Sequence, residues 1–237
     1  MFRHVLIGAA ILILFGAINV AAGPKLTISE NEFDFGYAPQ KAKLSHTFWV
    51  KSTGDEVLKI SKVIPGCGCT KAPMDKKIIA PGDSARLEII FSTRNYKGAI
   101  QKSPRIESNT LKGKTFVNIR TNIVQGEQST KTIVFSPPIL NLTKDKLSEN
   151  NEISFDISNV NAKDLQLKLI DWPGELFEVS IPENIPAGET IKATITLDKD
   201  ILGESFEKSL TFEINNDTSD RFTLPIRKQV FLVTSQN

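Results

Sequence analysis

Apolar residues alternate with polar ones in short runs along most of the chain, and Gly, Pro, Asn and Asp separate these runs. Every second residue of the stretch 85–91 is apolar, and the stretch 44–50 shows the same alternation with His46 in phase with Phe48. A period of two is typical of strands with one buried face, and no stretch carries the 3.6-residue period of an amphipathic helix. The sequence therefore predicts an all-β protein.

The pattern of the first half recurs, weakly but in order, in the second half. Pro81-Gly82-Asp83 precedes one alternating run, and Ala187-Gly188-Glu189 precedes another. Three further pairs match: Phe48 with Phe155, Leu58-Lys59-Ile60 with Leu165-Gln166-Leu167, and Ser108-Asn109 with Asn215-Asn216. Because each half has the size of an immunoglobulin-like domain, we predict two tandem immunoglobulin-like β-sandwiches, residues 24–124 and 130–237, joined by a polar link at residues 125–130.

The first 22 residues predict a signal peptide. A short polar start precedes an apolar run over residues 5–20, and Val20-Ala21-Ala22 offers small residues for cleavage. An uncleaved anchor is the alternative, but the run is shorter than the roughly 20 residues that span a bilayer. No cysteine follows it for a lipid anchor. We expect cleavage after Ala22 or Gly23, and no stable membrane span afterwards.

Charge and motif content exclude several classes of function. The 29 Lys and Arg residues balance 27 Asp and Glu residues, and no run of like charge suggests a groove for nucleic acid. Signatures of phosphate-binding loops, serine hydrolases and zinc proteases are missing, and His46 is the only histidine after the signal. We therefore expect no catalytic residues, no cofactor and no metal site.

Both cysteines lie in one short segment, Pro65-Gly66-Cys67-Gly68-Cys69-Thr70. The matching segment of the second half, Pro173-Gly174-Glu175-Leu176-Phe177, keeps Pro-Gly and lacks the thiols. A sandwich of this pattern therefore does not need the cysteines in order to fold. Cys67 and Cys69 form the candidate thiol site.

Three uses of these thiols stay open. In an extended segment the two side chains share a face, and a disulfide would then need a Cα separation near the upper end of the roughly 4.4–6.8 Å that bridges tolerate. Redox or covalent partnering is the second use, and Cu(I) binding is the third. His46 and Met74 are interpreted as packing residues rather than as metal ligands. Trp49 and Trp172 are interpreted as structural, with Trp172 capping the second core.

The first half also resembles a known protein family in several short motifs. Its markers are Phe33-Asp34-Phe35-Gly36, Ser45-His46-Thr47-Phe48, Thr53-Gly54, Leu58-Lys59-Ile60, the Cys-Gly-Cys-Thr motif, Pro81-Gly82-Asp83 and Ser108-Asn109. Through these motifs, the segment from about residue 24 to residue 124 resembles the bacterial immunoglobulin-like domains of unknown function that carry a Cys-Gly-Cys-Thr signature. That family is related in fold to PapD-like and major-sperm-protein-like domains. The resemblance implies export to the periplasm or cell surface of a Gram-negative bacterium.

We therefore expect a non-catalytic, exported protein that acts in binding or assembly. By analogy with PapD-like domains, an exposed sandwich edge would accept a strand from a protein partner in the cell envelope. The alternative is a thiol redox or Cu(I)-handling protein that uses Cys67 and Cys69.

Overall fold

The computed structural model describes residues 23–125, 132–143 and 147–230. Within these ranges the chain forms β-strands and one short 3₁₀ turn, η2 (Lys199–Ile201), without any α-helix, so the all-β prediction is confirmed. None of the described segments is a helix long and apolar enough to cross a membrane. The predicted signal peptide and most of the predicted link lie outside the described residues.

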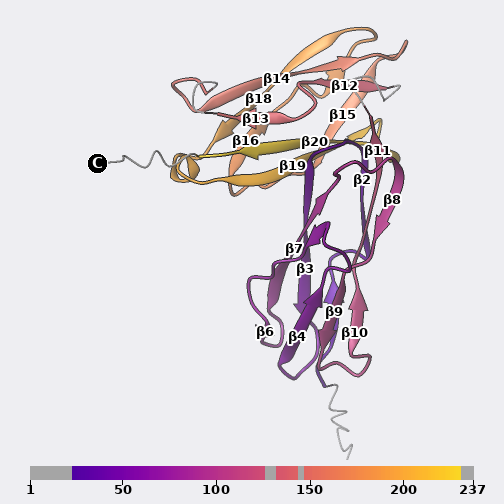
Figure 1. Ribbon diagram of the computed structural model, residues 1–237, viewed down its shortest axis with the longest axis vertical. Coiled ribbons are helices and arrows are strands. Elements are labelled where there is room, and N and C mark those ends of the chain that lie inside the picture. Colours follow the sequence, from indigo (N-terminus) through magenta and orange to yellow (C-terminus); the bar gives the residue numbers. More distant parts are fainter. Residues whose placement is uncertain (1–22, 126–131, 144–146, 231–237) are drawn as a thin grey trace, which may run out of the picture.

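The first half contains two facing layers of strands (Figure 1). One layer has the order β1-β3-β7-β5, formed by β1 (Leu26–Ile28), β3 (Lys43–Ser52), β7 (Ser84–Ser92) and β5 (Thr70–Lys71). The other has the order β10-β9-β4-β6, formed by β10 (Lys114–Phe116), β9 (Arg105–Ser108), β4 (Leu58–Ile64) and β6 (Ile78–Ile79). Three more strands extend this second layer: β2 (Glu32–Pro39), β8 (Gly98–Lys102) and β11 (Asn118–Val124).

The second half repeats this arrangement. One layer has the order β12-β14-β18-β16, formed by β12 (Ile133–Ser136), β14 (Glu152–Asn159), β18 (Thr190–Leu197) and β16 (Phe177–Ser180). The facing layer contains β17 (Asn184–Ile185), β15 (Leu165–Asp171), β19 (Phe206–Ile214), β20 (Asp217–Lys228) and β13 (Leu140–Leu142). In each half a strand near the start pairs in parallel with the last long strand, β2 with β11 and β13 with β20.

One sheet runs through both halves, which the sequence did not indicate. Its order is β17-β15-β19-β20-β2-β11-β8, and the halves meet where β2 pairs with β20 at Tyr37 and Phe222. In Figure 1 the strands of the upper half lie across the long direction of the lower half. The two halves are therefore joined by sheet hydrogen bonding in addition to the chain link.

Each half has its own apolar core. One cluster draws its buried residues from positions 33–123 and the other from positions 133–226. The predicted alternation is confirmed in β7, where Ala85, Leu87, Ile89 and Phe91 are fully buried. These cores arise because every second side chain of a strand points to the same face.

The internal repeat extends to individual hydrogen bonds. The Asn109 side chain accepts from the Lys59 N–H at 2.8 Å, and the Asn215 side chain accepts from the Gln166 N–H at 2.9 Å. The Pro-Gly-Asp and Ala-Gly-Glu turns also match, with Gly82 and Gly188 both at positive φ. Positive φ is accessible to glycine at little cost, which explains the shared residue.

Two of the predicted matches are displaced by one residue. Asn109 corresponds to Asn215, because the Asn109 side chain bonds β4 and the Asn215 side chain bonds β15, which is the equivalent strand of the second half. Cys69 corresponds to Leu176, because the Cys69 carbonyl accepts from the Ser92 N–H at the end of β7 and the Leu176 carbonyl accepts from the Asp198 N–H just after β18. The displacement comes from different turn lengths, which a sequence match without gaps does not register.

Candidate functional site

Cys67 and Cys69 form a disulfide in the turn between β4 and β5. Their Cα atoms are 5.2 Å apart, well inside the range that bridges tolerate. The expectation of an extended segment was wrong, because Gly66 takes a positive φ of 86° and the Thr70 N–H closes a turn onto the Cys67 carbonyl at 3.3 Å. The turn supplies the short Cα distance that an extended strand would not.

The two sulfurs differ in their surroundings. Cys69 is 5% exposed and belongs to the first core, whereas Cys67 is half-buried at its margin. The Thr70 hydroxyl lies 3.3 Å from the Cys67 sulfur, and the Arg94 guanidinium donates to the Gly68 carbonyl at 2.9 Å. An incoming thiolate would therefore reach the Cys67 sulfur more readily, with Cys69 as the leaving thiol.

Met74 and His46, the other side chains that could bind a metal, pack against apolar residues of the first half. Met74 packs against the first core as a half-buried side chain, as interpreted from the sequence. His46 is 8% exposed and its ring stacks on Phe33 at 3.7 Å between centroids. In the described ranges no group of three or more His, Cys, Asp or Glu side chains is arranged to hold a metal ion.

His46 also joins the two halves, which the sequence did not reveal. Its Nε2 bonds Glu30 at 3.0 Å, and its Nδ1 lies 3.1 Å from a carboxylate oxygen of Asp171, in ion-pair contact outside good hydrogen-bond geometry. Burial lowers the pKa of His46, but the two carboxylates outweigh burial and leave the pKa raised above its usual value. Protonated His46 is thus a charged link between the first half and the end of β15.

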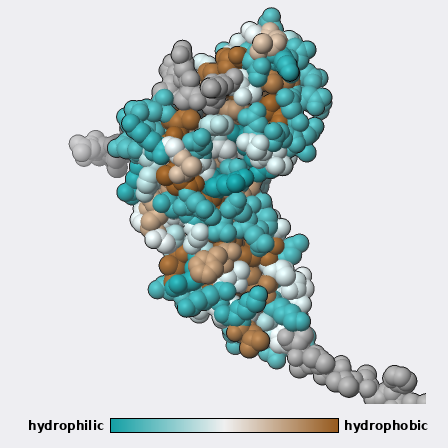
Figure 2. Space-filling view, turned by 90° about the vertical axis from the view of Figure 1, so that its right-hand side faces the viewer, coloured by the Kyte–Doolittle hydropathy of each residue, from teal (hydrophilic) through white to brown (hydrophobic). Residues whose placement is uncertain are grey.

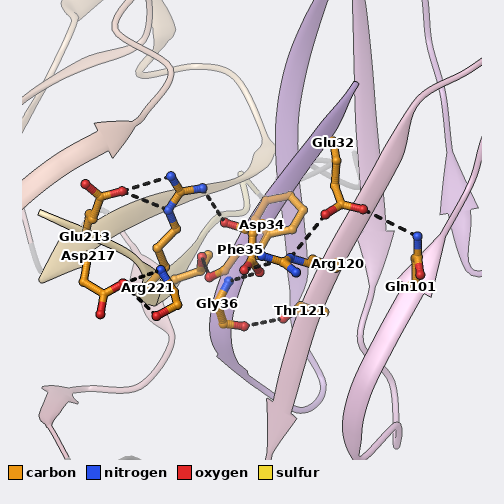
Figure 3. A network of polar contacts seen from close by, with 12 residues as sticks. Glu32, Asp34, Phe35, Gly36, Gln101, Arg120, Thr121, Glu213, Asp217 and Arg221 are labelled. Carbon is orange, nitrogen blue, oxygen red and sulfur yellow. Dashed lines mark hydrogen bonds and ion pairs between the residues drawn. The ribbon is translucent and has the colours of Figure 1, made fainter. Parts of the chain in front are cut away.

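A network of polar contacts fixes the junction of β2 and β20 (Figure 3). Arg221 of β20 pairs with Glu213 at 2.9 Å and donates to the Asp34 carbonyl of β2 at 3.4 Å. The Asp34 carboxylate binds Arg120 of β11 at 2.9 Å. Because the Arg221 and Glu213 side chains are largely buried, these contacts are weakly screened by solvent and hold the halves in one orientation.

The outer edge of β8 has free backbone groups. Val117 donates to the Pro104 carbonyl, so these two residues form a hydrogen-bonded pair of the ladder between β11 and β8. The next hydrogen-bonded pair, two residues further along, is Ile119 with Lys102. Hydrogen-bonded pairs alternate along an antiparallel ladder, so Gln101 directs its N–H away from β11, and so does Ala99. Neither N–H bonds another described residue. The edge is exposed at these outward-facing residues.

The repeat identifies the counterpart of this edge in the second half. In the first half Lys102 of β8 pairs with Ile119 of β11, and in the second half Lys208 of β19 pairs with Ile226 of β20. The edge of β19 near Lys208 is therefore the equivalent of the edge of β8. Side-chain contacts with the first half cover the matching part of β19: the Ser209 hydroxyl accepts from the Ser45 N–H at 3.0 Å and donates to the Ser45 carbonyl at 3.1 Å. Lys43 of β3 also forms an ion pair with Glu207, and Lys208 binds Glu88 of β7 at 2.5 Å. The same edge is therefore covered in one half and open in the other.

These features define a class of protein: two all-β cores of repeated topology joined through one sheet. Residues 26–123, which include the disulfide, match the family model described as a protein of unknown function (DUF1573). The match falls within the first half and agrees in extent with the resemblance noted in the sequence. No curated protein matches the chain.

Several solved structures resemble the chain at low identity. A protein of unknown function from Porphyromonas gingivalis W83 is 13% identical, with a TM-score of 0.36, over 86% of this chain and 99% of that one. The ASH/PapD-like domain 7 of human CEP192 is 10% identical, with a TM-score of 0.33, over 52% and 99%. The YadV chaperone is 10% identical, with a TM-score of 0.32, over 85% and 98%.

Proposed function

We propose that the protein is a non-catalytic binding or assembly protein of the bacterial cell envelope, exported to the periplasm or cell surface of a Gram-negative bacterium, and that it binds a protein partner by strand addition at the outer edge of β8. The open edge of β8 is the observation that carries this proposal. In the second half the equivalent edge of β19 is covered by the chain itself. In the first half it is left free, with outward N–H groups at Ala99 and Gln101.

The surface around β8 is suited to backbone recognition. Figure 2 shows the side of the molecule on which β8 lies in Figure 1, and its apolar areas are small and separated by hydrophilic residues. Such a face offers little apolar area to a partner, whereas a strand edge offers a row of hydrogen-bonding groups. Main-chain bonds would then supply affinity, and side-chain positions beside the edge would supply selectivity.

A proline variant tests the edge directly. Gln101→Pro removes an outward N–H and leaves the ladder to β11 intact, because proline is tolerated where an edge N–H faces solvent. Gln101→Ala is the matched control, since both variants lose the weak side-chain contact to Glu32 at 3.5 Å. In affinity capture from native envelope extracts, the wild type and Gln101→Ala should retain a partner that Gln101→Pro loses. Equal capture by a folded Gln101→Pro protein would refute strand addition at β8.

Export is supported by the short apolar run and by Val20-Ala21-Ala22. Mass spectrometry of the protein isolated from the native envelope should find a chain that begins near Gly23. An intact Met1 in washed membranes would instead indicate an anchor.

Thiol–disulfide exchange is a second candidate, favoured by the Cys67–Cys69 bond at the margin of the first core. An attacking thiolate would bond to the Cys67 sulfur and release Cys69 as a thiolate. The Cys69→Ala variant should then trap a partner as a mixed disulfide with Cys67, visible on a non-reducing gel. The absence of any adduct in vivo would remove this candidate. Cu(I) binding would first require reduction of the bond, because thiolates are the ligands.

A further inference from the structure

A small cleft lies between the two halves, on the side of β3 and β7 that faces away from the first core. It has a volume of about 210 Å³. The first half contributes Thr47 and Trp49 from β3, and the second half contributes Trp172 and Pro173 from the loop after β15. Neither half forms this cleft alone.

Trp172 does not cap the second core, contrary to expectation. It is absent from that cluster and 45% exposed, and Trp49 is 42% exposed. Neither indole N–H has a hydrogen-bond partner among the described residues. Large aromatic side chains with half-open faces and free N–H groups offer both apolar surface and hydrogen-bond donors to a ligand. Trp172 is displaced from the core because the turn after β15 directs it toward the first half.

The charged groups around the cleft are already paired with one another. Lys208 binds Glu88 at 2.5 Å, and Arg86 lies 3.6 Å from Glu175 across the junction. His46, which also lines the cleft, contacts Asp171. A charged ligand would have to compete with these ion pairs, and would find no unpaired counter-charge among the described lining residues. A neutral ligand meets no such cost.

We infer that this cleft binds a neutral pyranose ring of a glycan chain. A pyranose has flat C–H faces that pack on indole rings and a rim of hydroxyls that accept from indole N–H groups and bond the Thr47 hydroxyl. The cleft is smaller than the roughly 300–1,000 Å³ of typical pockets for larger ligands, which suits a single ring. Glycan binding is independent of strand addition at β8, which lies on another sheet edge.

The chain has only two tryptophans, and both line this cleft. Intrinsic fluorescence therefore reports on the site without background from other tryptophans. Hexasaccharides of β-1,4-glucose, β-1,4-N-acetylglucosamine and α-1,4-glucose are suitable neutral probes. An oligogalacturonate of the same length tests the requirement for neutrality, and a proline-rich peptide tests the rival ligand that also stacks on aromatic side chains.

At least one neutral hexasaccharide should change the fluorescence saturably, and calorimetry should give the same affinity. Trp49→Ala and Trp172→Ala should each weaken binding by about tenfold or more. Phe116→Ala is the matched control, because Phe116 is an aromatic side chain that is 50% exposed and lies outside the cleft. No response to any neutral probe at millimolar concentration would overturn the inference. So would tighter binding of the acidic probe or the peptide, or affinities unchanged in both tryptophan variants.

Discussion

At the level of single residues, the Cys67 and Cys69 motif is visible in the sequence, but the surrounding turn and core determine that the two thiols form a disulfide. The pair was predicted as a candidate site because both cysteines of the chain lie in one short segment, and the second half indicated that folding does not need them. The turn at Gly66, and not the spacing alone, brings the two Cα atoms to 5.2 Å. Burial of Cys69 then makes one sulfur part of the core and leaves the other at its margin.

The disulfide should contribute little to folding stability. The Cys67→Ala, Cys69→Ala double variant should lose about 1–2 kcal/mol of unfolding free energy, because the bond closes a very short loop and restricts the unfolded chain little. Urea denaturation of the oxidised wild type and the variant measures the difference. A loss above about 3 kcal/mol would show that the pair is a structural brace.

His46 should make stability depend on pH. The pKa of His46 is raised in the folded protein, so its contribution is fully present below the unfolded value of about 6.5 and is lost as pH rises through the folded pKa. Asp171→Asn removes one of the carboxylates that raise it. The stability difference between wild type and Asp171→Asn should therefore be larger near pH 5.5 than near pH 9.

Asp156→Asn is the control for this measurement, since Asp156 forms an exposed pair with Lys192 away from the junction. Urea titrations at each pH supply the free energies. A difference between wild type and Asp171→Asn that stays constant across pH would contradict a titrating link at His46.

At the scale of elements, the meeting of β2 and β20 depends on one glycine. Gly36 has a φ of 63°, and a Cβ at this position would lie 1.9 Å from the Arg221 carbonyl oxygen. Gly36 also accepts from the Thr121 hydroxyl at 2.9 Å, as Figure 3 shows. No other residue type allows β20 to approach so closely, so the glycine is needed for contact between the two halves.

Gly36→Ala should therefore destabilise the protein by about 3 kcal/mol or more, because the backbone of β2 or β20 must move. Gly113→Ala is a matched control: its φ is 65°, and nothing lies within 4 Å of the added Cβ. That variant should lose only about 1–2 kcal/mol, the cost of a left-handed conformation for alanine. Equal losses in thermal or urea unfolding would show that the close approach to β20 does not matter.

At the scale of the whole molecule, the shared sheet should couple the two cores. Domains in tandem commonly move relative to each other when their interface is small. Here β2 and β20 share a sheet, and Arg221, His46 and Lys208 contact the other half. The division into residues 24–124 and 130–237 stays a prediction from the sequence, but the halves are not expected to behave independently.

Calorimetry should accordingly show a single unfolding transition for residues 23–237, with equal calorimetric and van't Hoff enthalpies. The physical reason is that unfolding of either core exposes an edge of the common sheet together with buried ion pairs. Two resolved transitions in the wild type would contradict this coupling. The Gly36→Ala variant should instead show two transitions, because the added methyl group forces β2 away from β20 and uncouples the two cores.

Local patterns in the sequence were sufficient to predict the class of fold, the strands with one buried face and the internal repeat. These follow from a period of two and from glycine turns, which depend on residues close together in the chain. The burial of alternate residues in β3 and β7 was predictable for this reason. The disulfide was one of three open uses, because spacing alone does not set the turn.

No local pattern predicted which distant strands meet. The pairing of β2 with β20, the contact of His46 with Asp171 and the cleft between Trp49 and Trp172 each join residues more than 100 positions apart. The alternation of a strand defines its buried face but not its neighbour at the edge, since backbone hydrogen bonding is the same for every sequence. The packing of the two cores selects those neighbours, and thereby leaves the edge of β8 open while covering that of β19.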